Sequence, residues 1–537
     1  MNKYNLSSGF LTSLKSLKPL KSLMIFLTAA TLVSCSDFDF DFTKKILEEP
    51  PLTSLSSEQI FADLEKTQAF LDGVYFQWKK THVNRKTFFT MLGTDEIQQG
   101  EYQCVRESYS YYQGAFDRYD GGYDAWDNQY TAEIWNVRYP VVVLATEALG
   151  PLREKEKTAT GSDSIKIKSC ISQASFYRAN VLFDLVRYWG EIPISDVVNG
   201  KIILSGRRTL SEVYGIIEAD LKATEEYAPK KNDPANVRIP TVWAAKGMLA
   251  KIYMYAQEES GFRNLNKAKG LLQEIIEQGG YDLIMPYSKL WTGTDNTDLE
   301  VIYKLAFNNI WPDTNELQWY TGSRAVSNDR KCYMGGYDLA LPTEYCYKNI
   351  WEEGDQRKDE SIRYKFNEGG YTPASVSGFG EDQEAPHIKK FEDKRTNDFY
   401  NTGKDFFILR FSDILLLYAE CLNEEGLTVD AVKIVNNRVR TRAWGGVLPA
   451  EAKWNEGMSK EEFKEKIMDE RMRELCFENW RRMDLLRTGK FVEYINARNP
   501  WAKATGGPKV YQQRFPIPLV EIEQNPNIAR SDQNPGF

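Results

Sequence analysis

The residues whose type and spacing best suit chemistry are two carboxylates, Glu474 and Glu478, in a segment with helical periodicity. Residues four apart share one face of a helix, and glycoside hydrolysis uses a pair of carboxylates. Arginines surround both, in the run 470–474 and at Arg481-Arg482. Nearby guanidinium groups favour the ionised carboxylate, which is a poor general acid. We therefore interpret this pair as part of structural ion pairs rather than as a catalytic pair.

Cys35 is a second candidate, for covalent modification. It directly follows Leu32-Val33-Ser34, at the end of an apolar run over 23–33 that lysines precede. The run is shorter than the ~20 residues that a membrane-spanning helix needs, and its layout is typical of a secretory signal. A cysteine directly after the small residue looks like a bacterial lipobox, in which Cys35 is lipidated and becomes the new N-terminus. The alternative is an ordinary signal peptide with a chance cysteine.

The sequence lacks the residue patterns that several other kinds of catalytic or binding site need. The chain has only two histidines, His82 and His387, and neither lies in a cluster with metal-ligand spacing. There is no G-x-S-x-G elbow and no phosphate-binding loop, so we expect no cofactor and no metal site. With 68 Lys+Arg against 76 Asp+Glu the net charge is −8, and no basic stripe suggests a nucleic-acid partner.

The cysteines after Cys35 are expected to be mostly structural. Cys421 and Cys476 fall on apolar faces of predicted helices, where cysteine behaves as a small hydrophobic residue. An oxidising destination would permit a Cys332–Cys346 disulfide, but the sequence does not establish that pairing.

The elements that must position these residues are mainly helices. Apolar residues recur with helical spacing, and successive helix pairs of roughly 34 residues predict tetratricopeptide-like packing, in which each pair must stack on its neighbours. The predicted helices cover residues 57–74, 132–149, 167–189, 210–227, 241–257, 265–278, 410–423, 428–442 and 460–480.

Two regions break this pattern. Residues 94–127 and 281–400 are rich in Gly, polar residues and aromatics, which predicts long loops with short irregular elements. Long loops in a compact protein are often functional, and their aromatic content argues against disorder.

The predicted organisation is a lipoprotein signal peptide at 1–34, a lipidated acidic tether at 35–55 and a single domain at 56–537. That domain has an N-terminal part at 56–280, a loop-rich ligand-binding insert at 281–400 and a C-terminal helical part at 401–537.

Two further carboxylates, Asp413 and Glu420, fall within an apolar helix and need buried partners. The candidate partners are Arg438, Arg440, Arg471 and Arg473. Helical spacing also predicts the pairs Asp469–Arg473 and Glu478–Arg482.

Several motifs follow one another along the chain. They are Ala174-Ser175-Phe176-Tyr177-Arg178-Ala179, Tyr188-Trp189-Gly190-Glu191-Ile192-Pro193, Phe407-Ile408-Leu409-Arg410-Phe411-Ser412-Asp413, Asn437-Arg438-Val439-Arg440-Thr441-Arg442-Ala443, Glu470-Arg471-Met472-Arg473-Glu474, Arg481-Arg482-Met483-Asp484-Leu485-Leu486-Arg487, Phe515-Pro516-Ile517-Pro518 and Gln533-Asn534-Pro535-Gly536-Phe537. In this order they resemble the SusD/RagB family of outer-membrane nutrient-binding lipoproteins, and the resemblance runs from Cys35 to Phe537.

The resemblance implies a mainly helical, lipid-anchored protein at the cell exterior that binds an oligosaccharide or polysaccharide without chemistry. It also implies a partner, a SusC-type TonB-dependent outer-membrane transporter, to which the helical repeat face docks and the cargo is delivered. The acidic run after Cys35 resembles the export signal of some outer-membrane lipoproteins. Two alternatives stay open: a peptide cargo, as in the RagB branch, and a surface glycoside hydrolase.

Candidate ligand residues come from the irregular regions, because sugar rings stack on aromatic faces while polar groups bond their hydroxyls. The family does not keep such residues in fixed motifs, so none is transferred by position, and the alternative for each aromatic residue is core packing. The candidates are Trp311, Trp319, Tyr320, Tyr123 and Trp126 for stacking, and Asp95, Gln98 and Arg324 for hydroxyl groups.

Overall fold

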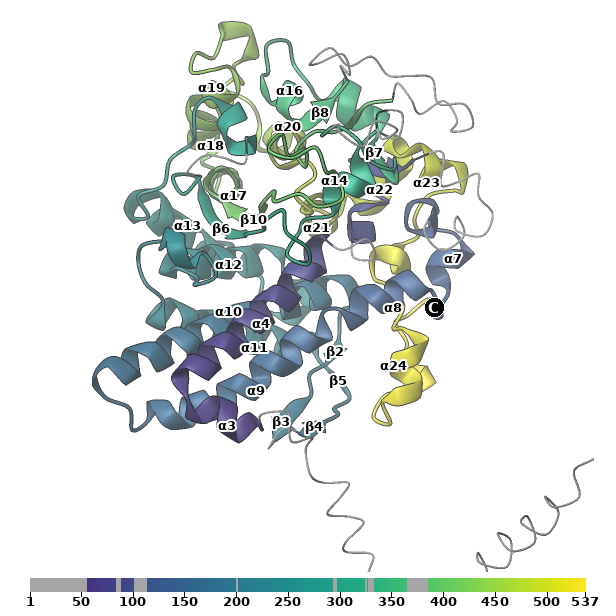
Figure 1. Cartoon of the computed structure of the whole chain (residues 1–537). Helices are drawn as coiled ribbons and strands as arrows, with labels where there is room; N and C mark the ends of the chain where they lie inside the picture. The colour runs from purple at the N-terminus through teal and green to yellow at the C-terminus, as the bar shows by residue number, and fades with distance from the viewer. Residues whose placement is uncertain are drawn as a thin grey trace, which may run out of the picture. The chain divides into compact units, whose positions relative to one another are not determined.

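The computed structural model describes residues 56–83, 88–100, 114–198, 201–292, 297–323, 326, 333–364 and 385–537. Residues Ser57–Phe537 form one compact unit, built mostly from helices (Figure 1). The predicted signal peptide and tether, with Cys35, and also Cys332 lie outside the described residues. Within the described part of the chain, no helix is both long and apolar enough to cross a membrane.

The first half of this unit is a series of helices, and α11 and α13 begin and end where the periodicity predicts. The helices are α3 (Ser57–Ala62), α4 (Leu64–Val83), α7 (Gly121–Asp124), α8 (Gln129–Asn136), α9 (Tyr139–Glu156), α10 (Gly161–Trp189), α11 (Leu210–Tyr227), α12 (Val242–Tyr255) and α13 (Leu265–Gln278).

These helices pack as neighbours in chain order. Helix α10 packs against α9 and α11, α12 packs against α11 and α13, and α13 packs against α17 (Phe411–Glu424) from the C-terminal part. Figure 1 shows α4, α9, α10 and α11 side by side. Successive pairs thus bury one another's apolar faces, which confirms the predicted mainly helical, tetratricopeptide-like scaffold.

Two predicted helices are each two helices, for local reasons. The chain breaks at Asp63, whose carboxylate accepts hydrogen bonds from the N–H groups of Glu65 and Lys66 and so caps α4. A second break separates α8 from α9, where Pro140 occupies the first turn of α9. Proline lacks an N–H and is favoured in the first turn of a helix, where that group would have no partner within the helix.

The C-terminal part is also helical, with shorter elements than predicted. The expected helix over 428–442 is α18, a π-helical turn and α19. The helices after α13 are α14 (Leu317–Thr321), α16 (Arg357–Ser361), α17 (Phe411–Glu424), α18 (Thr428–Ile434), α19 (Thr441–Ala443), α20 (Lys460–Leu475), α21 (Arg481–Arg487), α22 (Phe491–Arg498), α23 (Pro500–Ala504) and α24 (Leu519–Gln524). The 3-10 turns are η1 (Phe88–Met91), η2 (Pro234–Asn236), η3 (Glu258–Ser260), η4 (Tyr287–Trp291), η9 (Ala450–Ala452), η10 (Val510–Gln513) and η11 (Arg530–Asp532), and the π-helical turns are η5 (Tyr345–Asn349) and η8 (Val435–Arg440).

The predicted helix over 460–480 ends early, at Leu475. Phe477 and Asn479 have φ angles of +67° and +63°, in the left-handed region that ends a helix. The N–H of Phe477 donates to the carboxyl Oε1 of the buried Glu96 at 2.9 Å, which helps hold the turn. Glu478 therefore lies beyond the helix that carries Glu474, and the expectation that the two share a helix face is wrong.

Glu96 makes this turn sensitive to pH. Burial, opposed by the Phe477 N–H, raises the pKa of Glu96 to about 8, against ~4.3 for an unfolded chain. The folded state therefore holds more protons than the unfolded state between these values, and this group lowers stability as the pH rises from about 5 to 8. We expect Glu96→Gln to be about as stable as the wild type at pH 5 and more stable at pH 8, in urea unfolding followed by circular dichroism.

The control for this prediction is Glu461→Gln, at an exposed position of α20. Its unfolding free energy should follow the wild-type pH profile. Parallel profiles for Glu96→Gln and the wild type would contradict the prediction.

Short strands complete the fold and bring the ends of the loop-rich segment together. The antiparallel pair β6–β10 places residue 306 beside residue 405, so the chain between them leaves and re-enters the helical body at one place. Among the described residues the strands form five two-stranded antiparallel sheets: β1 (Ile97–Gln99) with β7 (Ala340–Pro342), β2 (Ile192–Pro193) with β5 (Arg207–Arg208), β3 (Asp196–Val198) with β4 (Lys201–Ile203), β6 (Val301–Leu305) with β10 (Phe406–Arg410), and β8 (Ile362–Arg363) with β9 (His387–Ile388).

Candidate functional site

A tight turn between β6 and α14 presents an exposed tryptophan. The N–H of Ile310 donates to Asn308 Oδ1 at 2.8 Å, and Asn308 Nδ2 donates to Asp313 Oδ2 at 2.9 Å. Lys79 of α4 also pairs with Asp313, which ties the turn to the helical body. At its tip Ile310 is 70% exposed and Trp311 76% exposed. Such exposure is unusual for a tryptophan, because large apolar side chains are normally buried.

A cluster of aromatic residues lies on α14 and two nearby segments. The ring centroid of Trp319 is 4.9 Å from that of Tyr400, in an edge-to-face arrangement, and 6.0 Å from that of Tyr337. The hydroxyl groups of Tyr337 and Tyr400 are hydrogen-bonded at 2.7 Å. All three rings are half-buried, so each keeps part of its surface in contact with solvent.

The segment 398–404 contacts both the turn and this cluster. It carries Tyr400, and the carbonyl of its Thr402 accepts from the Asn315 N–H at 2.9 Å. Gly403 packs so closely on the turn that an added Cβ would lie 3.1 Å from backbone atoms of Asn308 and Asn309. We call Trp311, Trp319, Tyr337 and Tyr400 the aromatic surface. Tyr337 and Tyr400 were missed from the sequence, where only the aromatic content of residues 281–400 pointed to them.

Three of the predicted ligand residues are buried. Tyr320 is 0% exposed and donates to Glu316, and Tyr123 is 2% exposed and donates to the Gln512 carbonyl at 2.7 Å. Asp95 is also 0% exposed, and its carboxylate accepts two hydrogen bonds from Arg481, at 2.7 and 2.6 Å. Because these side chains expose almost no surface, we do not retain them as ligand contacts.

The other three predicted residues have different positions. Trp126 is half-buried and packs against the hydrophobic core, and no contact joins it to the aromatic surface among the described residues. Gln98 is half-buried on β1, opposite Leu341 of β7, and the chain from Tyr337 to β7 separates it from Trp319. Arg324 lies outside the described residues.

The carboxylates considered for catalysis lie in a buried ion-pair network. Arg410 donates to Glu478 at 2.8 Å, to Glu300 at 2.7 Å and to Glu474 at 3.0 Å. Burial alone would raise the pKa of Glu474, but Arg442, Arg410 and other cations lower it well below its ordinary value. Glu474 is therefore held ionised, as predicted, and cannot serve as a general acid at neutral pH.

The detailed pairing in this network differs from the prediction. Asp413 pairs with Arg471 at 2.8 Å, as expected, but also with Lys251. Glu420 pairs mainly with Arg487, at 2.7 Å, a partner that was not predicted. Three other predicted partners bind different groups: Arg438 pairs with Asp282, Arg440 with Glu352 and Glu470, and Arg473 with Glu470 and Glu352 rather than with Asp469. The predicted pair Glu478–Arg482 does not form, because Arg482 donates to the hydroxyl groups of Tyr119 and Tyr123.

The described part of the chain holds no group of three or more His, Cys, Asp or Glu residues arranged to bind a metal ion. His387 contacts Asp338 at 2.5 Å, and His82 lies 3.9 Å from Asp184. Both histidines are buried among core residues.

Comparison with known proteins places this arrangement in a family. Residues 314–537 match the model of the SusD family, and residues 56–254 match a SusD-like model described as starch-binding associating with outer membrane. SusD-like protein P2 of Formosa agariphila is 25% identical over 94% of this chain and 97% of its own length. The chain belongs to the SusD-like family.

Solved structures share the fold. A SusD homolog from Bacteroides thetaiotaomicron has a TM-score of 0.72 at 20% identity, covering 90% of this chain and 98% of its own. A laminarin binding SusD-like protein has a TM-score of 0.67 at 22% identity, covering 88% and 99%. Surface glycan-binding protein A from Bacteroides thetaiotaomicron, solved in complex with laminarihexaose, has a TM-score of 0.69 at 17% identity, covering 88% and 99%.

Proposed function

We propose that this protein captures glycans at the cell surface, by stacking sugar rings on the aromatic surface, and carries out no chemistry on them. The observation that carries the proposal is the exposed Trp311, on a turn that contacts segment 398–404, together with the half-buried cluster of Trp319, Tyr337 and Tyr400. Flat aromatic faces suit the apolar faces of sugar rings. Relatives of the same fold whose names record glycan or laminarin binding support the choice of ligand.

Incubation of the purified protein with defined ligands tests this function. Laminarin, starch and other neutral polysaccharides in an affinity gel should slow the protein's migration, and chromatography of the mixture should detect no released sugar. Released oligosaccharides would overturn the non-catalytic proposal in favour of a glycoside hydrolase. Binding to peptides with no response to any glycan would favour a peptide cargo instead.

We also propose that the captured glycan passes to a SusC-type TonB-dependent outer-membrane transporter, with the protein tethered beside it. Residues 56–254 match a SusD-like family model that is described as associating with the outer membrane, and this match supports the location. An acyl chain on Cys35 would hold the soluble body at the membrane, since each buried CH₂ contributes ~0.8 kcal/mol. The acidic linker that follows Cys35 would let this body move.

Cys35→Ala should abolish membrane retention and leave glycan binding unchanged, because Cys35 is not one of the residues proposed to bind the glycan. Fractionation of cells into membrane and soluble material, followed by affinity gels on the soluble protein, measures both. The control Cys104→Ala should stay with the membrane. Full retention of Cys35→Ala in the membrane fraction would rule out the lipid anchor at this cysteine.

A further inference from the structure

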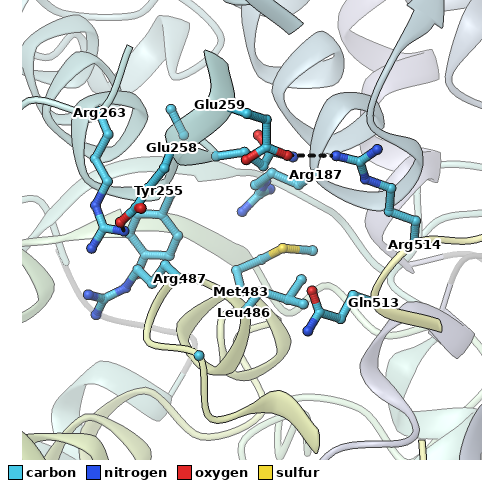
Figure 2. Close-up of a pocket in the computed structure, with 13 residues that line it drawn as sticks. Arg187, Tyr255, Glu258, Glu259, Arg263, Met483, Leu486, Arg487, Gln513 and Arg514 are labelled. Atoms are coloured by element: carbon cyan, nitrogen blue, oxygen red, sulfur yellow. Dashed lines mark hydrogen bonds and ion pairs between the residues drawn. The ribbon is translucent and has the colours of Figure 1, made fainter. Parts of the chain in front are cut away.

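A cavity of about 350 Å³ lies between the end of α10, the α12–η3 corner, α21 and residues 513–514. Figure 2 shows its lining, with Met483 and Leu486 of α21 near the middle and Arg187, Arg263, Arg487 and Arg514 arranged around them. No member of the aromatic surface lines it. Apolar side chains with a few convergent polar groups are typical of a small-molecule site, and the volume is within the usual range.

Arg187 is a buried polar group of this cavity, and it is incompletely paired. Its side chain is 7% exposed. Nε donates to the Phe183 carbonyl at 3.0 Å and Nη2 donates to Asp184, but Nη1 has no hydrogen-bond partner in the described part of the chain. A buried donor without a partner is costly, so an acceptor that enters the cavity would relieve this cost.

The charge around Arg187 is also incompletely balanced. Asp184 lies 3.7 Å from Arg138, a second fully buried guanidinium, and 3.9 Å from His82. Burial lowers the pKa of His82 to about 4, so this ring is neutral at pH 7. Two buried arginines thus share one carboxylate among the ion pairs of the described residues, which leaves a positive charge that an anion would offset.

The charges at the mouth of the cavity do not cancel this excess. Arg263 pairs with Glu258 and Arg514 with Glu259, each through one contact, at 2.9 and 3.0 Å. The two glutamates are 81% and 61% exposed, so solvent screens them, while both arginines keep further N–H groups. Figure 2 shows Arg514 and Gln513 on one side of the cavity and Arg263 on the other.

We infer that this cavity is a second ligand site, which takes the carboxylate or sulfate group of an acidic sugar residue. The anionic group binds Arg187, with Arg263 or Arg514 as a second contact. The sugar ring lies on Met483 and Leu486, and Gln513 bonds a hydroxyl group. This inference rests on the proposal that the protein binds glycans, but it uses none of the residues that carry that proposal.

Isothermal titration calorimetry with glucuronate, glucose 6-sulfate, glucose and glutamate tests the site. We expect glucuronate or glucose 6-sulfate to bind. Glucose lacks the negative charge and glutamate lacks the sugar ring, so both should bind at least about tenfold more weakly. Binding of neither acidic sugar would overturn the inference. Glutamate binding as tight as that of the acidic sugars would contradict the assignment to sugars.

Three variants locate the binding. Arg187→Gln should reduce acidic-sugar affinity at least about tenfold, since a charged hydrogen bond is lost. Leu486→Phe keeps every charge and fills part of the cavity, whereas Arg514→Gln changes a side chain at the mouth of the cavity. Both variants are expected to fold, and both should weaken acidic-sugar binding. Arg153→Gln, an exposed arginine outside the cavity, is the control. Wild-type affinity in both Leu486→Phe and Arg514→Gln would show that the acidic sugar binds elsewhere.

The two proposals fail separately. Substitution of Trp311 or Trp319 should weaken the binding of neutral glycans and leave the affinity for glucuronate unchanged. The cavity variants should weaken glucuronate binding and leave the affinity for neutral glycans unchanged. Loss of acidic-sugar binding in the tryptophan variants would contradict a separate second site.

Discussion

Replacing Arg410 by Met is expected to lower the free energy of unfolding by about 3–5 kcal/mol, the cost of breaking a buried ion pair from one side. The Arg410 side chain is 1% exposed and contacts the carboxylates of Glu300, Glu474 and Glu478. Methionine fills a similar volume but leaves these carboxylates without one of their cations. Urea unfolding followed by circular dichroism at pH 7 measures the change.

The matched control is Arg438→Met, in the π-helical turn η8. Arg438 pairs with Asp282, and their side chains are 35% and 62% exposed. An exposed pair contributes only about 0–1 kcal/mol, so this variant should unfold almost like the wild type. Equal stability losses for the two variants would mean that the buried network does not stabilise the fold as its geometry indicates.

Asp95→Asn is expected to cost about 3 kcal/mol or more of stability and to leave glycan affinity unchanged. Burial alone would raise the pKa of Asp95, but Arg481 and Arg498 lower it below its ordinary value, so the carboxylate is ionised in the fold. Removing its charge leaves Arg481 buried without a counter-ion. Stability that depends on an ionised carboxylate is present above its unfolded pKa and is lost as the pH falls below about 4.

Urea unfolding and glycan affinity measured on the same preparation of Asp95→Asn separate the structural role from ligand binding. Asp196→Asn, at an exposed position of β3, is the control and should change neither. A weaker glycan affinity with wild-type stability would return Asp95 to the ligand contacts.

The sequence predicted the scaffold well, because its helices depend on local periodicity. Helices α11 and α13 begin and end as predicted, and the misplaced boundaries have local causes such as the cap at Asp63 and Pro140. The turn after Leu475 was missed because the carboxyl group that helps hold it belongs to Glu96, 381 residues before Phe477 in the chain.

The pairing of charges was predictable only in kind. The density of arginines around Glu474 indicated ion pairs, and these are present. Their partners were not predictable, because Lys251 reaches Asp413 and Arg487 reaches Glu420 from other helices. Periodicity describes one face of one helix and does not say which helix packs against it.

The same limit applies to the aromatic candidates. Trp319 and Tyr320 are adjacent in the sequence and equally suited to stack a sugar ring, yet one is half-buried beside Tyr400 and the other is fully buried. The direction of each side chain from the short helix α14 decides between ligand contact and core, and no sequence periodicity is long enough there to reveal it.

The affinity of Trp311→Ala and Trp319→Ala for a neutral glycan that the wild type binds tests the central claim most directly. Each stacked ring should contribute about 1–3 kcal/mol, a range borrowed from base–aromatic stacking. Trp311 is mostly exposed, so Trp311→Ala should keep wild-type stability. The control is Trp501→Ala, at a half-buried tryptophan on α23, which should keep wild-type affinity. We predict weaker binding in both test variants. Wild-type affinity in both would contradict glycan capture on the aromatic surface.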